Sequence, residues 1–85
     1  MKQFRTYQLA RDFYLNIAPI KLPRPLGDQL RRAAAAVALN LSEGYGRLSR
    51  SDQRRFFTIA LGSARECQAV FDFAKEAFTP SLHNH

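Results

Sequence analysis

The sequence predicts an all-α protein, an antiparallel up-and-down bundle of three helices that is completed by oligomerisation. Apolar residues recur at steps of three and four in three long segments, which is the period of one helix face. Clusters of proline and glycine separate these segments, as turns between helices require. The predicted helices cover residues 3–18, 26–43 and 50–78. A chain of 85 residues is expected to form one domain, residues 1–79, followed by a polar tail, residues 80–85.

The first predicted helix is amphipathic and ends at a proline loop. Phe13 and Ile17 belong to its apolar face. Residues 19–25, PIKLPRP, hold three prolines, which forbid a continuous helix. A rigid connector is therefore predicted here, with Ile20 and Leu22 holding it to the core.

The second predicted helix is rich in alanine. Its packed face consists of Leu26, Leu30, Ala33, Val37 and Leu41, with Ala34 and Ala36 beside them. Small residues give a thin helix that neighbours can approach closely, so it is expected at the centre of the bundle. Asp28 near its start is expected to pair with Arg31 or Arg32. Asn40 falls on the apolar face and is expected to hydrogen-bond across to another helix.

The segment GYGRL, residues 44–48, is predicted to be a turn between two helices. Gly44 suits the left-handed position that follows many helix C-termini. Gly46 adds a second permissive point. Glycine loops before helices also bind phosphate, but the spacing here matches neither the dinucleotide fingerprint nor the P-loop.

The third predicted helix is long and carries two apolar stripes. Ser49 is expected to cap it, with Asp52 in a capping-box position. One stripe consists of Phe56, Ala60, Ser63, Cys67, Val70, Ala74 and Ala77. The second stripe is the predicted oligomer interface and consists of Phe57, Leu61, Ala64, Phe71 and Phe78. Gly62 is expected to mark a close helix crossing.

The charge of the chain favours an anionic partner. The formal net charge is +6, and ten of the thirteen basic residues are arginine, which binds phosphate in two-point fashion. The alternative is that these charges serve solubility and internal ion pairs. Cys67 is the only cysteine, no apolar run is long enough for a membrane span, and no signal peptide is visible. A cytoplasmic location is therefore expected.

Five pieces of the sequence together resemble a known family. They are QLRRAA (29–34), NLSEGYGR (40–47), Ser49, the Arg55–Phe56 pair and IALGSARE (59–66). This pattern is similar to that of the four-helix-bundle proteins encoded in 23S rRNA intervening sequences. The accessory proteins of diversity-generating retroelements are similar in fold. By position, the family signature corresponds to Arg32, Asn40, Glu43, Gly44, Tyr45, Gly46, Arg47, Gly62, Ser63 and Glu66.

The resemblance implies a cytoplasmic, non-enzymatic bundle that assembles into a ring, typically a homopentamer. It also implies association with RNA or DNA, and a reverse transcriptase or ribosome-related partner. The sequence departs from the family at Ala38, where a proline is usual, so a straighter second helix is expected. Family members continue into a fourth helix, whereas this sequence ends at His85. Either three helices suffice or a partner fills the fourth position.

No set of residues predicts catalysis. Cys67 lies on an apolar stripe without a histidine base nearby in the sequence, so an inert core thiol is expected. Glu43 and Glu66 are more typical of a polar network with arginines than of an acid–base pair. No spacing of cysteine and histidine suits zinc. The chain is therefore predicted to be no enzyme and to hold no metal or cofactor.

A cluster of arginines is the best candidate site. Arg47, Arg50, Arg54 and Arg55 surround the start of the third predicted helix, where helix electrostatics favour anions rather than cations. Arg31 and Arg32 extend the cluster if the helices pack antiparallel. The predicted function is self-assembly and nucleic-acid binding with little sequence specificity. The alternative is a structural or adaptor oligomer that binds a protein partner.

Overall fold

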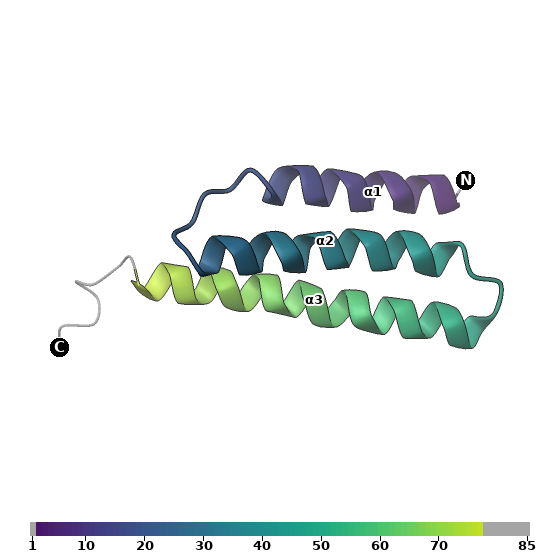
Figure 1. Cartoon of the computed structure of the whole chain (residues 1–85). Coiled ribbons are helices and arrows are strands. Elements are labelled where there is room, and N and C mark those ends of the chain that lie inside the picture. Colours follow the sequence, from purple (N-terminus) through teal and green to yellow (C-terminus); the bar gives the residue numbers. More distant parts are fainter. Residues whose placement is uncertain (1, 78–85) are drawn as a thin grey trace.

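Three antiparallel helices make up the described part of the protein. A computed structural model describes the backbone of residues 2–77 and the side chains of residues 5–77. The helices are α1 (Lys2–Ile17), α2 (Leu26–Tyr45) and α3 (Arg50–Ala77), each running opposite to the one before it (Figure 1). The predicted all-α architecture is confirmed, whereas oligomerisation stays a prediction. Phe78 and the predicted tail, residues 80–85, lie outside the described residues.

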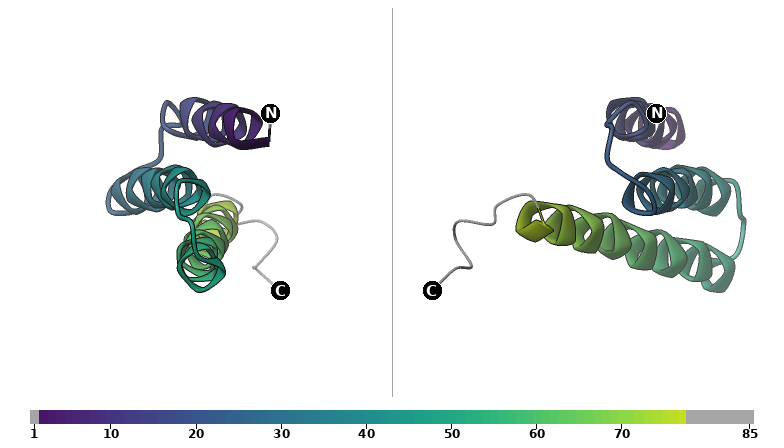
Figure 2. Two further views of the ribbon diagram at one scale, coloured as in Figure 1. Left: turned by 90° about the vertical axis from the view of Figure 1, so that its right-hand side faces the viewer. Right: turned by 60° about the vertical axis from the view of Figure 1, so that its left-hand side comes forward.

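The alanine-rich helix α2 is the centre of the molecule, as its composition predicts. It packs against α1 on one side and α3 on the other (Figure 1). Seen end-on, α3 lies below α2 and to one side, so the three helices do not form a flat layer (Figure 2). The helix is unbroken through Ala38, in line with the absence of a proline at that position. The chain measures 53 × 23 × 19 Å along its principal axes.

The core is built from small side chains, while several large apolar side chains are exposed. Five of the nine buried apolar residues are alanine, and Leu30 is the only large side chain that is completely buried among the described residues. The exposed large apolar residues are Tyr7, Leu9, Leu15, Leu39, Leu48, Ile59, Leu61 and Phe73. A chain of this size buries a limited fraction of its surface. The distribution leaves much of its apolar surface without a partner in the single chain.

The connector and the start of α2 agree with the sequence-based predictions. Ile20 and Leu22 pack against the core cluster around Leu30. The Asp28 carboxylate accepts a hydrogen bond from Arg31 Nη2 at 2.7 Å, so of the two predicted partners it is Arg31 that pairs with Asp28. This pairing stabilises the first turns of α2 because the acidic group lies near the positive end of the helix dipole.

Two predicted contacts between helices are not made within the single chain. Asn40 Nδ2 donates to the Ala36 carbonyl oxygen at 2.8 Å, within its own helix. The amide is only partly buried, so a bond to the preceding turn satisfies it without a second helix. Gly62 is exposed, and a Cβ added there would meet nothing within 4 Å. Within the single chain, α3 therefore has no close helix crossing at Gly62.

The predicted left-handed end of α2 at Gly44 is wrong. The helix continues through Gly44 to Tyr45, and no described residue has a positive φ. Gly46 is the C-cap in a right-handed conformation, and its N–H donates to the Glu43 carbonyl oxygen at 3.1 Å. The reason for a glycine at position 44 is space rather than backbone conformation. A Cβ there would lie 2.6 Å from Phe57 Cε1.

Candidate nucleic-acid interface

Four arginines gather at one end of the molecule, which we call the arginine end. It comprises the turn between α2 and α3 and the first turns of α3, and it carries Arg47, Arg50, Arg54 and Arg55. Ser49 holds the start of α3, as predicted, because its Oγ accepts a hydrogen bond from the Asp52 N–H at 3.1 Å. The arginines therefore project from a capped and ordered helix start.

Two of these arginines, Arg47 and Arg55, make contacts within the chain. Arg47 Nη2 donates to Glu43 Oε2 at 2.8 Å, which confirms the expected pairing of Glu43 with an arginine. The Arg47 guanidinium carbon lies 4.8 Å from the centre of the Phe56 ring, and that of Arg55 lies 5.0 Å from it. Both distances are within the range of a cation–π interaction. We call this group, Glu43, Arg47, Arg55 and Phe56, the Phe56 cluster.

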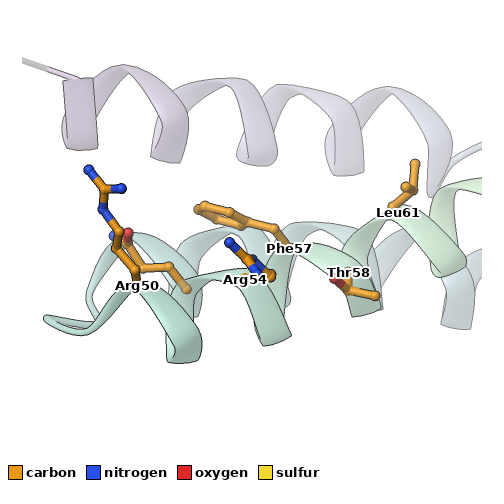
Figure 3. Close-up of a pocket in the computed structure, with 6 residues that line it drawn as sticks. Arg50, Arg54, Phe57, Thr58 and Leu61 are labelled. Atoms are coloured by element: carbon orange, nitrogen blue, oxygen red, sulfur yellow. The ribbon is translucent and has the colours of Figure 1, made fainter.

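The other two arginines line an open depression on α3. Arg50 and Arg54 share this depression with Phe57, and the other lining residues are Gln53, Thr58 and Leu61. Its volume is about 420 Å³. Figure 3 shows the side chains along one side of α3, with the Phe57 ring between Arg50 and Leu61. We call it the Phe57 depression.

Arg50 and Arg54 have no anionic partner in the described part of the chain. Neither takes part in an ion pair, a side-chain hydrogen bond or a ring contact there. They lie four residues apart on one helix, where a pair of like charges destabilises the helix by about 0.2–0.5 kcal/mol. An external anion would relieve this repulsion.

Arg31 and Arg32 lie away from the arginine end. They belong to the first half of α2, and Arg32 lies thirteen positions before Tyr45, the last residue of the helix. At 1.5 Å per residue this is about 20 Å along the axis. Arg31 is also paired with Asp28. The structure therefore does not bring these two residues into one patch with the other four.

The predicted oligomer-interface residues divide into two environments. Phe71 packs against the core cluster, and Phe57 contacts Tyr45 with ring centres 5.2 Å apart. Leu61 is exposed, and Ala64 is half-buried. Part of the predicted stripe thus serves the single chain, and Leu61 remains available for other contacts.

The two signature carboxylates do not lie in one network. Glu43 pairs with Arg47 at the arginine end. Glu66 is exposed near the middle of α3 and takes part in no ion pair among the described residues. Ser63 beside it on the same helix is half-buried. The separation gives no support to an acid–base pair, because its two members would have to reach the same substrate.

Cys67 has the environment of a core residue. It is buried in the cluster with Leu30 and Val70. Burial raises the pKa of the Cys67 thiol, and the nearby Glu66 charge raises it further. The residue therefore carries little of the thiolate that nucleophilic chemistry needs. The described part of the chain holds no group of three or more metal-ligating side chains.

A second feature is an apolar groove between α1 and α2. It consists of two depressions that share Tyr14, Ala38 and Leu39, and Leu15 lines one of them and Ala35 the other. Leu39 is 68% exposed there. Across the helices that the structure describes, none is both long enough and apolar enough to cross a membrane.

The aromatic partners of the arginines were missed by sequence reasoning. Phe56 was expected only in a buried stripe and Phe57 only in an oligomer contact. The available signal is the run Arg54-Arg55-Phe56-Phe57, which places two cations next to two rings. Such interleaving is typical of surfaces that bind nucleic acid by charge and stacking.

Comparison with known proteins identifies a family for nearly the whole chain. The sequence model described as 23S rRNA-intervening sequence protein matches residues 2–79. No curated protein and no solved structure gives a significant match.

Proposed function

Because the chain belongs to the 23S rRNA-intervening sequence protein family, we propose that it is a non-catalytic protein that self-assembles and binds the backbone of nucleic acid. The family name relates it to RNA in general terms and states no catalytic activity. The observation that carries the proposal is the arginine end, where Arg50 and Arg54 are exposed and have no carboxylate partner among the described residues.

The chemistry of these groups suits phosphate rather than base edges. A guanidinium binds phosphate oxygens in two-point fashion, and the formal net charge of +6 adds a long-range attraction to a polyanion. Contacts from Arg50 and Arg54 to phosphate oxygens position a strand but carry no direct sequence information. Little sequence specificity is expected.

Self-assembly is proposed on the apolar surface. Leu39 and Phe73 are more than 60% exposed, and the core of the single chain is small. Burial of such side chains between copies contributes roughly 25 cal/mol per Å² of apolar area. Assembly also repeats the arginine end in each copy, and several weak phosphate contacts then act together. The expected number of copies, from the family, is five.

A charge reversal tests the binding. The variant Arg50→Glu/Arg54→Glu/Arg55→Glu should lose affinity for a labelled RNA or DNA in fluorescence anisotropy, and the affinity of the parent should fall steeply with salt. Arg65→Glu, an exposed substitution farther along α3, is the control for a general effect of charge. If the triple variant binds as tightly as the parent, the arginine end is not the interface.

The second candidate is a structural or adaptor oligomer that binds a protein partner, such as a reverse transcriptase or a ribosome-related protein. The apolar groove between α1 and α2 favours it. This candidate predicts a stable assembly that retains no nucleic acid after purification. Light scattering before and after nuclease treatment, with the ultraviolet absorbance ratio of the sample, separates the two candidates.

A further inference from the structure

The Phe57 depression combines the two chemical features of a nucleotide, an anion site and a flat apolar surface. Arg50 and Arg54 supply two guanidinium groups, and Phe57 supplies an aromatic ring on the same side of α3 (Figure 3). Gln53 and Thr58 add an amide and a hydroxyl at the border. The volume of about 420 Å³ leaves room for a base beside the ring.

The Phe57 ring is held in place by the rest of the fold. One edge of the ring lies against Gly44, where even a methyl group would not fit, since a Cβ would lie 2.6 Å from Cε1 and 2.9 Å from Cδ1. The ring also contacts Tyr45 at 5.2 Å between ring centres. A ring that is ordered before binding gives a stacking surface at a low cost in conformational entropy.

The charges of the depression favour a phosphate strand over a second copy of the chain. Arg50 and Arg54 have no carboxylate partner in the described residues, whereas Arg47 is paired with Glu43. A second copy carries the same formal charge of +6, so bringing it onto these arginines adds repulsion unless its few carboxylates are aimed at them. A nucleic-acid strand supplies both a phosphate for the arginines and a base for the Phe57 ring.

We propose that the Phe57 depression binds one nucleotide of a single strand, with the base against the Phe57 ring and the flanking phosphates on Arg50 and Arg54. In a duplex both faces of each base are covered by stacking, so only an unpaired nucleotide offers a free face. This inference rests on the proposed nucleic-acid binding and adds that the preferred class is single-stranded. Every base has such a face, so sequence preference stays weak.

The test compares single strands with and without bases, and a duplex. Fluorescence anisotropy measures binding of the full chain to labelled oligouridylate, to oligothymidylate, to the same deoxyribose-phosphate strand without bases, and to a duplex. Stacking of one base contributes about 1–3 kcal/mol, so oligothymidylate should bind at least about fivefold tighter than the abasic strand. The two base-bearing strands separate RNA from DNA as the source of the nucleotide.

Two sets of variants locate the effect. Phe57→Leu keeps an apolar side chain but removes the ring, and it should abolish the difference between oligothymidylate and the abasic strand. Tyr7→Leu removes an exposed ring on α1 and should leave that difference unchanged. Because Phe57→Leu also loses its contact with Tyr45, the exposed Thr58 provides a second test. Thr58→Glu should weaken binding of every strand, whereas Gln68→Glu, which adds the same charge at an exposed position farther along α3, should not.

The outcomes distinguish this inference from the proposed function. If the parent binds no strand at any salt concentration, nucleic-acid binding itself fails. If the parent binds with the expected salt dependence, but the abasic strand and the duplex bind as tightly as oligothymidylate, only the nucleotide site is overturned. It is overturned as well if Phe57→Leu and Thr58→Glu change the mass of the assembly in light scattering but leave strand binding unchanged, because the depression is then a protein contact.

Discussion

Phe56 and Phe57 are neighbours in the sequence, and each lies beside two arginines. The two pairs of arginines differ in whether they make contacts within the chain. At Phe56, the Arg47 and Arg55 guanidiniums lie about the ring, and Glu43 neutralises Arg47. At Phe57, Gly44 and Tyr45 hold the ring, and Arg50 and Arg54 have no ion-pair partner in the part of the chain that the structure describes. One step along a helix turns a side chain by about 100°, which is enough to move it to a different surface.

The comparison teaches that the number of arginines does not define the interface. Four cations lie at the same end of the molecule, but a cation already paired with a carboxylate has less to gain from a phosphate. An unpaired cation on a helix start is mildly unfavourable in the isolated chain. Arg50 and Arg54 are therefore the two residues of the arginine end that we expect to bind phosphate.

The largest expected effect comes from neutralising one pair of arginines or the other. Arg50→Gln/Arg54→Gln and Arg47→Gln/Arg55→Gln remove the same net charge from the same end of the chain. The first pair should lose most of the binding, and the slope of log affinity against log salt should fall by about 2, since each phosphate contact contributes about 1. The second pair should change that slope much less. Equal losses in both double variants, measured by anisotropy across a salt series, would mean that only total charge matters.

A smaller effect is expected from filling the space behind the Phe57 ring. Gly44→Ala should destabilise the fold by about 1–3 kcal/mol through overpacking against Phe57. This loss exceeds the gain in helix propensity of up to about 1 kcal/mol. Displacement of the ring should also weaken binding of single strands.

The matched control is Gly62→Ala, because that position faces open space. It should stabilise the helix by about 0.5–1 kcal/mol in urea unfolding followed by circular dichroism. Destabilisation by Gly62→Ala would instead indicate that another chain packs closely at this glycine in the assembly.

The smallest expected effect comes from removing the carboxylate partner of Arg47, so that Arg47 resembles Arg50 and Arg54 in having no ion pair. Glu43→Gln removes the carboxylate that pairs with Arg47 and leaves the cation free. Exposed pairs of this kind contribute about 0.3–0.5 kcal/mol, so the loss of stability should be slight. Affinity for nucleic acid should rise, with a steeper salt dependence. A fall in affinity would mean that Glu43 positions Arg47 for binding rather than occupying it.

Much of this architecture follows from local rules and was predicted from the sequence. The three helices, the proline connector, the Ser49 cap and the Asp28–Arg31 pair depend on residues within a few positions of one another. The buried positions Leu30, Ala33 and Val37 follow from helical periodicity.

What the sequence by itself determined is therefore the set of helices, their faces and the starts of α2 and α3, because each is decided by hydrogen bonds and contacts within a turn or two. Only the tertiary structure decided which arginines are occupied, why position 44 is a glycine, and that Arg31 and Arg32 lie away from the arginine end. These properties depend on the neighbouring helix and on its rotation about its own axis. Gly44 appears in the sequence as the end of a helix, but it becomes a close contact once Phe57 is packed against it.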